Sequence, residues 1–565
     1  MKHFFLWVIS VTFLFNLQAQ TPAKYWVQFK DKAGSPYSIE RPEEFLSPRA
    51  IEKRARFDIE ITEQDLPVNE SYIRQLLAID PNMVLLTKSK WFNGVTVYTT
   101  TADIQGKITE LPFVNLCECT VQLEQEETFD YPKTSYSAPS KVKEVLTVTP
   151  GKDLNYGYCA KQVGINNAHW LHRLGAHGEG MLMMVLDAGF ENANSISHFK
   201  ALREEGRLHG TRSFVFPGRS VFISGSHGTM VLSCITGYKE DELMGTAPKA
   251  DFYLAQTEDE RTENKIEEDN WVAAAEWADS LGCDVINSSL GYYKFDNKAQ
   301  SYRYEDMDGQ VSRASQAGTI AASKGIIVCV SAGNEGDEDW HYITCPADAK
   351  DALTVGAIYP NGTAADFSSY GPTSDGRVKP DGAAVGAYAI VAEPSDETDV
   401  SFGTSFSSPI FSGMVACLWQ LFPEKSNYEI MEAIRIAGHQ HSHPTDHLGY
   451  GITNFMEAYN YLLRDLNSEI LMVFPSHASK STCKAGYISW KGCPSFSIEV
   501  RMDGSSEILR QEIRVKGEKM SGGGIYGEPK IKLPKLPKEM DYGIARIKII
   551  TPDGKSYEQV VGLHH

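Results

Sequence analysis

The chain of 565 residues lacks an excess of basic residues, since 54 Lys and Arg stand against 73 Asp and Glu and give a net charge of −19. Proteins that bind nucleic acid generally need a basic surface that neutralises phosphates. This composition therefore argues against a nucleic-acid partner. Residues 467–565 differ, because fifteen Lys and Arg stand against eleven Asp and Glu there. The change of sign near residue 465 indicates a separate domain.

Long apolar runs are also scarce. After the N-terminus no stretch reaches the roughly 18 apolar residues of a membrane-spanning helix, so we expect no membrane span in the mature protein. The one long run, from Phe4 to Leu17, follows Lys2 and ends before Gln18-Ala19-Gln20, a pattern typical of a secretory signal peptide. We predict a signal peptide over 1–20 and a protein that is secreted or displayed at the cell surface, with the periplasm as the alternative.

Signatures of metal sites are missing too. No C-x-x-C pair and no H-E-x-x-H motif occurs, which argues against zinc sites of those types. Two clusters contain side chains that can bind metal ions. The first consists of His439, His441, His443 and His447, and the second of Glu305, Asp306 and Asp308. The histidines have no supporting carboxylate or cysteine spacing, and the carboxylates lack most of a twelve-residue calcium loop. We therefore predict a solvated loop and a turn, no metal site and no required cofactor, with calcium left open.

The ten cysteines lie in an exported chain, where disulfides can form. Cys483 and Cys493 flank a predicted hairpin and are the expected pair. Most of the others lie in apolar runs, such as Ile326–Val330, and are expected as small buried hydrophobic residues. Two acidic stretches, 240–242 and 258–269, are expected to be solvated faces.

After the signal peptide the chain divides into four parts. Residues 21–127 alternate strand-like and helix-like segments and predict a small α/β domain. Residues 128–155 are rich in proline and serine and predict an exposed linker with a processing site. Residues 156–465 alternate buried strands with helices, which predicts an α/β domain with a mostly parallel sheet. Residues 466–565 consist of strands and turns and predict a β-sandwich.

In the first part, strands are expected around 25–29, 83–86, 95–98 and 114–123, and helices around 47–57, 70–79 and 102–111. In the last part, strands are expected at 496–502, 508–515 and 542–550. No internal repeat occurs.

Four polar residues lie where their surroundings are apolar or rich in glycine. Asp187 ends a buried strand pattern, and ligands of parallel sheets bind at the carboxyl ends of strands. His227 opens an apolar helix, Asn334 follows a strand, and Ser405 begins the long apolar helix that contains Pro409. A helix start carries free backbone N–H groups that can stabilise an oxyanion. Taken singly, a structural His or an N-cap Ser is the simpler interpretation.

Together, Asp187, His227, Asn334 and Ser405 lie in the segments DAG, HGT, AGNEG and GTSFSSP, in that order. This arrangement resembles the subtilisin-like serine protease family over about 156–460. The resemblance implies a three-layer α/β domain with a mostly parallel sheet. An α/β-hydrolase is a poorer match, because the sequence around Ser405 does not fit G-x-S-x-G and the order of the three residues differs.

The resemblance also implies roles. Ser405 would be the nucleophile, His227 the general base and acid, and Asp187 the residue that fixes the His227 tautomer. Asn334 and the Ser405 backbone N–H would form the oxyanion hole. One residue departs from the family pattern, because Ala188 stands where the family usually has Ser or Thr after the Asp.

Substrate-binding residues follow from the same resemblance. Ser289-Leu290-Gly291 would be the edge strand that pairs with an extended substrate backbone. Ala332 and Gly333 would form the opposite wall of the pocket for the residue before the cut bond. Thr344 falls at the floor of that pocket and would shorten it, and Glu335 lies near its rim. Tyr292 and Tyr293 either contact substrate or pack.

The flanking parts complete the expected organisation. The unit at 21–127 lies where this family carries a propeptide that acts as an intramolecular inhibitor. Segments Ile531–Lys538 and Ser556–Val561 resemble the C-terminal sorting domain of secreted Bacteroidetes proteins, which implies a secretion machinery as partner. A plain β-sandwich for stability or substrate binding is the equal alternative.

The sequence therefore predicts a secreted serine endopeptidase that is made as a zymogen and acts on polypeptides. A catalytically silent family member that binds other proteins is the alternative from another class. A specialised processing enzyme with few substrates is the third hypothesis.

Overall fold

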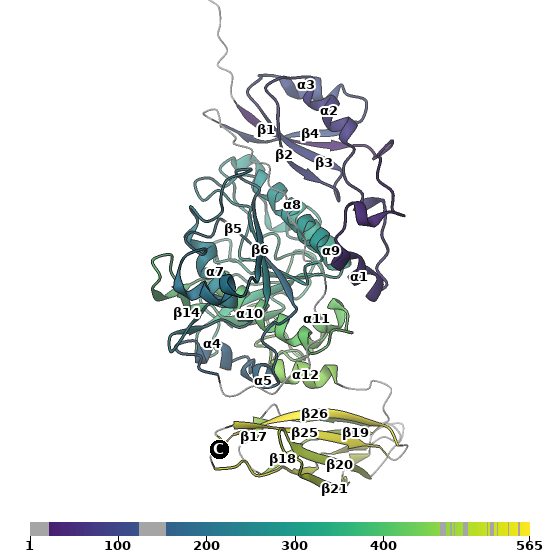
Figure 1. Cartoon of the computed structure of the whole chain (residues 1–565), viewed down its shortest axis with the longest axis vertical. Coiled ribbons are helices and arrows are strands. Elements are labelled where there is room, and N and C mark those ends of the chain that lie inside the picture. The colour runs from purple at the N-terminus through teal and green to yellow at the C-terminus, as the bar shows by residue number, and fades with distance from the viewer. Residues whose placement is uncertain are drawn as a thin grey trace, which may run out of the picture.

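The computed structural model describes residues 22–123 and 154–463, and residues 470–564 with short gaps. The predicted signal peptide and nearly all of the predicted linker lie outside the described residues. Three parts follow one another along the long axis of the molecule: an N-terminal α/β unit, a central α/β domain and a C-terminal β domain (Figure 1).

The N-terminal unit is a four-stranded antiparallel sheet in the order β2-β3-β1-β4. Its elements are β1 (Ala23–Phe29), α1 (Pro48–Arg56), α2 (Glu70–Leu77), β2 (Val84–Ser89), β3 (Gly94–Thr99), α3 (Ile104–Thr109) and β4 (Val114–Gln122). Apolar residues of the sheet, α2 and α3, among them Val27, Leu76 and Ile104, form its core. The strands and helices expected from the sequence of this part are confirmed.

Helix α1 lies apart from that sheet and packs beside the central domain (Figure 1). It begins where the sequence signals a helix start, because the Ser47 side chain accepts the Ala50 N–H and Pro48 occupies the first turn. The Ser47 N–H donates to the Ser280 carbonyl at 2.8 Å. The sequence correctly predicted this helix, but not that it contacts another domain.

Buried ion pairs join the N-terminal unit to the central domain. Arg54 of α1 lies 2.6 Å from Asp279 and 3.0 Å from Asp65, and Lys90 lies 2.7 Å from Asp279. Lys324 lies 3.1 Å from Asp65. The side chains of Arg54, Asp65 and Asp279 are each at most 2% exposed. Removing one partner would leave a buried charge uncompensated, which is strongly unfavourable.

The central domain is built on a seven-stranded sheet whose strands are all parallel. In spatial order they are β13 (Gly382–Val385), β12 (Leu353–Ile358), β11 (Ile327–Ser331), β10 (Val285–Ser288), β5 (Leu182–Asp187), β9 (Asp251–Gln256) and β6 (Leu208–Ser213). These strands read as continuous apolar runs because helices bury both faces of the sheet. The predicted three-layer architecture is confirmed.

Alternation along β5 shows the two interfaces. Met183 and Val185 belong to one core, with helices α7 (Ser226–Thr236), α10 (Thr404–Gln420), α11 (Asn427–Ile436) and α12 (Phe455–Leu462). Met184 and Leu186 belong to the other, with α8 (Ile266–Leu281) and α9 (Arg313–Ser323). Shorter elements are α4 (Ala160–Gly164), α5 (His169–Arg173), α6 (Lys200–Glu204), β7 (Tyr238–Lys239), β8 (Leu243–Met244), β14 (Ala387–Ala392) and β15 (Thr398–Phe402).

The expectation of solvated faces is confirmed for Glu240 and Asp241, but for 258–269 it is wrong except at 260–262, which are exposed. Glu268 is fully buried and accepts the Ser312 hydroxyl at 2.7 Å. Asp269 is 2% exposed and pairs with Arg313 at 2.7 Å. The reason is that α8 lies between the central sheet and the N-terminal unit, so its charged residues meet partners instead of water.

The C-terminal β domain contains a five-stranded and a four-stranded sheet. The first consists of β17 (His477–Ala478), β26 (Ser556–His564), β25 (Tyr542–Ile550), β20 (Ser495–Met502) and β21 (Ile508–Arg514). The second consists of β16 (Ile470–Val473), β19 (Gly486–Ser489), β23 (Ile525–Gly527) and β22 (Glu518–Lys519), and β18 (Thr482–Lys484) pairs with β24 (Lys530–Lys532). The three strands expected here are confirmed.

The predicted Cys483–Cys493 disulfide is wrong. Cys483 carries a free, buried thiol on β18, and Cys493 lies outside the described residues. The prediction assumed one hairpin between the two cysteines. Instead β18 pairs with β24, and β19 pairs with β16 and β23, so strand neighbours come from distant parts of the sequence.

Candidate active site

Asp187 and His227 meet at the carboxyl end of the central sheet. Asp187 is the last residue of β5, and His227 is the second residue of α7. His227 Nδ1 lies 2.8 Å from Asp187 Oδ1. The close approach requires glycine at position 228, because a Cβ there would lie 2.1 Å from the Gly189 carbonyl oxygen. The two side chains that the sequence singled out are thus held in a hydrogen bond.

The departure at Ala188 has a structural consequence. Asp187 Oδ1 accepts both His227 and the Ala188 N–H, the latter at 2.8 Å. Asp187 Oδ2 is buried and has no hydrogen-bond partner among the described residues. A Ser or Thr at position 188 would carry a hydroxyl donor, which alanine lacks.

The electrostatics of His227 favour a base that accepts a proton readily. Burial opposes the charged imidazolium, but the charge and hydrogen bond of Asp187, with a further contribution from Glu260, more than compensate. The pKa of His227 is therefore raised above its ordinary value. The ring lies beside Phe406, the neighbour of Ser405, at a centroid distance of 5.8 Å.

Ser405 is the second residue of α10, and Gly403 is the N-cap of that helix, so the ordinary N-cap interpretation of Ser405 is wrong. Ser405 is 8% exposed. Its hydroxyl donates to the Ser289 carbonyl at 3.3 Å, and the Ser289 hydroxyl donates back to the Ser405 carbonyl at 2.8 Å. No hydrogen bond joins Ser405 to His227 within the described residues. Catalytic hydrogen bonds are often long or unformed without substrate.

Asn334 follows β11 and faces the start of α10. Its Oδ1 accepts the Thr404 N–H at 2.8 Å and the Thr404 hydroxyl at 3.0 Å. These two bonds fix the amide orientation, because only the carbonyl oxygen of an Asn side chain can accept. The Nδ2 atom is thereby left as the donor, and it lies near the helix start, since a Cβ on Gly403 would be 3.7 Å from it.

The predicted substrate strand and pocket wall also lie together. Ser289-Leu290-Gly291 follows β10, and Ala332-Gly333 follows β11, the neighbouring strand. Thr344 lies between them: its N–H donates to the Ala332 carbonyl at 3.3 Å, and a Cβ on Gly291 would lie 2.3 Å from its Oγ1. Thr344 Oγ1 is buried and has no partner among the described residues.

Tyr292 and Tyr293 pack against protein. The Tyr292 ring is fully buried and its hydroxyl donates to Glu258 at 2.7 Å, while Tyr293 stacks on Trp340. Glu335 turns its carboxylate toward Ser369, whose hydroxyl donates to it at 2.8 Å.

In both clusters considered as metal ligands, side chains make other contacts. His439 Nδ1 accepts the Ile452 N–H at 2.8 Å, and His447 packs on Tyr370. Asp308 caps a turn by accepting the Gln310 N–H at 2.7 Å. In the described part of the chain no group of three or more His, Cys, Asp or Glu is placed to hold a metal ion. None of the described helices combines the length and apolar character needed to cross a membrane.

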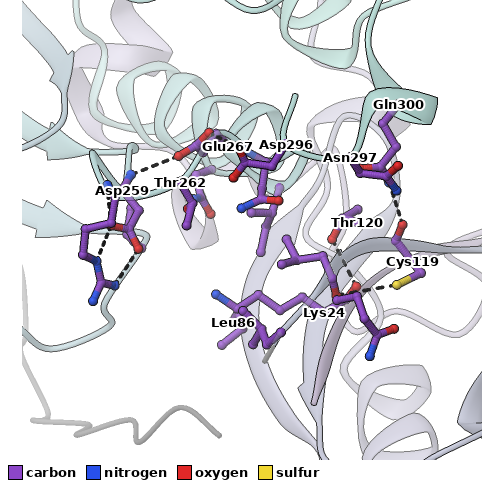
Figure 2. A pocket seen from close by; sticks show the side chains of 18 of the residues that line it. Lys24, Leu86, Cys119, Thr120, Asp259, Thr262, Glu267, Asp296, Asn297 and Gln300 are labelled. Atoms are coloured by element: carbon purple, nitrogen blue, oxygen red, sulfur yellow. Dashed lines mark hydrogen bonds and ion pairs between the residues drawn. The ribbon is translucent and has the colours of Figure 1, made fainter. Parts of the chain in front are cut away.

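Two cavities lie at the N-terminal end of α8, and the smaller one is lined by residues of the candidate site. A larger one of about 980 Å³ lies between β4 with its neighbours and the segment before α8 (Figure 2). A smaller one of about 540 Å³ is lined by His227, Ser289-Leu290-Gly291 and the acidic segment Glu258–Glu263. This acidic segment is a part of the site that was not predicted from the sequence. Its position directly after β9, at the same sheet edge as Asp187, was the available signal.

Known proteins are similar to both the N-terminal unit and the central domain of this chain. The family model described as "Subtilase family" matches residues 178–451, and the model "Peptidase S8 propeptide domain, Bacteroidota" matches residues 24–134. A thermostable alkaline protease of Halalkalibacterium halodurans is 27% identical over 269 residues, which cover 47% of this chain and 64% of that protein. The serine protease AprX of Bacillus subtilis is 26% identical over 289 residues, covering 46% and 61%. The chain thus spans less than two thirds of the length of these relatives.

A solved structure, the epidermin leader peptide processing serine protease of Staphylococcus aureus, superimposes with a TM-score of 0.50 at 15% identity, covering 79% of this chain and all of that one. At that identity the likeness concerns the fold. With the central parallel sheet in place, and with both the peptidase and the propeptide models matched, the chain belongs to the subtilase family.

Proposed function

We propose that the protein is a secreted serine endopeptidase, made as a zymogen, that uses Ser405, His227 and Asp187. The observation that carries the proposal is the buried Asp187 carboxylate bonded to His227 Nδ1 at 2.8 Å, beside the start of α10. This bond directs the Nε2 atom of the neutral ring outward as a base. A fluorophosphonate probe that labels wild-type protein at Ser405, together with hydrolysis of casein, tests the proposal. Absence of labelling and of hydrolysis would favour the silent binding protein.

The proposed chemistry proceeds in two halves. The Ser405 hydroxyl turns from the Ser289 carbonyl toward His227, which removes its proton as Oγ attacks the substrate carbonyl carbon. The resulting oxyanion accepts hydrogen bonds from Asn334 Nδ2 and the Ser405 N–H. His227 then gives its proton to the leaving amine. Water repeats the sequence on the acyl-enzyme and releases the acid.

The N-terminal unit is proposed as the inhibitory propeptide. Its support is the propeptide model match and the buried ion pairs of Arg54, Asp65 and Asp279. It also contributes three hydrogen bonds to Glu276 of α8, from the Ser89 hydroxyl and the N–H groups of Lys90 and Trp91, at 2.5 to 3.0 Å. These contacts would hold the unit in place after the linker is cut.

Arg54→Ala is expected to raise hydrogen exchange of the α1 amides by about 10²–10³-fold or more, because breaking a buried ion pair typically costs about 3–5 kcal/mol. Arg56→Ala is the matched control on the same helix. Arg56 pairs with Glu52 while both are exposed, so about 1 kcal/mol or less is at stake. Hydrogen exchange of α1 amides measures both, in a Ser405→Ala background that prevents self-cleavage. Equal exchange rates in the two variants would contradict a contribution of the ion-pair network.

Thr344→Gly is expected to widen the substrate pocket. The Thr344 side chain fills the space over Gly291 between the two pocket strands, so the wild-type enzyme should prefer a small residue before the cut bond. Removing the side chain should raise kcat/KM for a Phe or Leu peptide relative to an Ala peptide by about 10–200-fold, the scale of filling an apolar pocket. If the ratio of the two peptides stays the same, Thr344 does not limit the pocket.

Export and sorting are proposed from the sequence pattern at the two ends of the chain. The C-terminal β domain is also docked on the central one, since the Asn460 amide exchanges hydrogen bonds of 3.0 and 2.9 Å with the Val560 backbone. If the domain sorts the protein, deletion of 467–565 should leave folded protein in the periplasm. Loss of the folded protein in place of retention would indicate a stabilising role.

A further inference from the structure

The smaller cavity beside His227 is lined by more carboxyl groups than the protein pairs with cations. Among its lining side chains are the carboxyl groups of Glu258, Glu260, Glu263 and Asp296. Its one arginine, Arg261, forms a two-bond ion pair with Asp259 at 2.6 and 2.7 Å. Within the described residues no ion pair reaches Glu258, Glu260 or Glu263. The cavity therefore offers unpaired carboxylates next to the candidate base.

Glu258 is the deepest of these groups. It is only 8% exposed, and its Oε1 accepts the Tyr292 hydroxyl at 2.7 Å. Burial and the nearby charge of Glu263 raise the pKa of Glu258 to about 8, and burial and Asp296 raise the pKa of Glu263 to about 7. A cation in the cavity would return both groups to their ionised forms.

The geometry favours a long cationic side chain over a metal ion. No three carboxylates among the described residues converge at a distance that would hold a metal. The cavity instead extends over about 540 Å³ along the irregular segment Ser289-Leu290-Gly291 that follows β10. The same loop also lines the larger cavity, with Asp259, Thr262 and Asp296 common to both (Figure 2). Such an open, acidic channel suits the flexible stem and charged end of lysine or arginine.

Substrate geometry identifies the position of that side chain. The pocket for the residue before the cut bond lies on the side of Thr344, Ala332 and Gly333, and none of these lines the acidic cavity. Successive side chains of an extended peptide point to opposite sides. The next residue upstream therefore points toward His227 and the carboxylates.

We propose that this cavity is a specificity pocket that binds a lysine or arginine at the second substrate residue before the cut bond. Glu258 and Glu263 contact its charged end. This assignment rests on the proposed endopeptidase function, and it adds the class of substrate: polypeptides with a basic residue at that position.

Three quenched fluorescent peptides test the proposal. They carry Arg, Met or Glu at the second position before the cut bond and Ala at the first, and they are otherwise identical. The full chain is used after incubation until its mass is constant. For wild type, kcat/KM of the Arg peptide should exceed that of the Met peptide at least about tenfold. The Glu peptide should have the lowest kcat/KM of the three. Glu258→Gln and Glu263→Gln should each reduce the Arg/Met ratio at least about threefold.

Glu424→Gln is the matched control, since Glu424 is exposed and does not line the cavity. Because each ratio is taken within one preparation, loss of folded protein cancels. An Arg/Met ratio of one with all peptides hydrolysed would overturn the pocket and leave the proposed function intact. An Arg/Met ratio that stays at the wild-type value in both Glu variants would also overturn the pocket. So would an Arg/Met ratio of one if chelation of calcium lowered the rates of all three peptides equally. No hydrolysis and no fluorophosphonate labelling would overturn both proposals.

Discussion

Replacement of Ser405 by alanine is expected to keep the full-length chain intact and to lower peptide hydrolysis by about 10⁶-fold, the scale that removal of the nucleophile has in subtilisin. The physical reason is that the neighbouring Thr404 hydroxyl cannot replace it, because that hydroxyl is bonded to the Gly333 carbonyl and to Asn334 Oδ1, both at 3.0 Å. The measurement is intact mass over time, with wild type beside the variant. Only wild type should lose a fragment that ends within 128–155.

Ser412→Ala is the matched control for this result. Ser412 lies on the same helix and its buried hydroxyl donates to the Pro409 carbonyl at 3.0 Å, away from the candidate site. That variant should process and hydrolyse like wild type. If wild type stays whole but is labelled by a fluorophosphonate, the serine is competent and maturation needs another protease. Processing of the Ser405→Ala chain at the wild-type rate would contradict self-cleavage.

Replacement of Asp187 by asparagine is expected to lower kcat by about 10⁴-fold, the size of the effect when the triad carboxylate is changed to an amide. The amide removes the charge that favours the His227 imidazolium and no longer fixes the productive tautomer. Asp251→Asn is the control, because Asp251 and His209 form a similar pair at 2.9 Å outside the site.

The same variant has a pH signature with a defined sign. In wild type the pKa of His227 is raised, so the neutral base is lost, and kcat/KM falls, as the pH drops through a value above the ordinary histidine pKa of about 6.5. Without the Asp187 charge and hydrogen bond, burial is opposed only by the smaller contribution of Glu260, so the pKa of His227 falls. The acid limb of the residual activity should move to lower pH. A limb that stays in place would show that Asp187 does not control the base.

Local sequence determined much of the framework. The apolar runs at 181–186, 252–255, 285–287 and 326–330 predicted buried strands, and each lies within one residue of an observed strand. The helix expected around 47–57 is α1, and its start at Ser47 and Pro48 follows local capping chemistry. Asp187, His227, Asn334 and Ser405 were recognised from short motifs around them, since polar residues at strand ends and helix starts are visible locally.

Only the tertiary structure decided which distant segments meet. It placed α1 on α8 and buried the charged residues of 258–269, which look solvated from composition because their partners, among them Arg313, lie far along the chain. It paired the Cys483 strand β18 with β24, about fifty residues later in the chain, because strand pairing follows three-dimensional register and not sequence distance. It also brought Glu258 and Glu263 to the rim of the His227 site. Burial and through-space charge are properties of neighbours in three dimensions, so the acidic cavity and its unpaired carboxylates could be found only there.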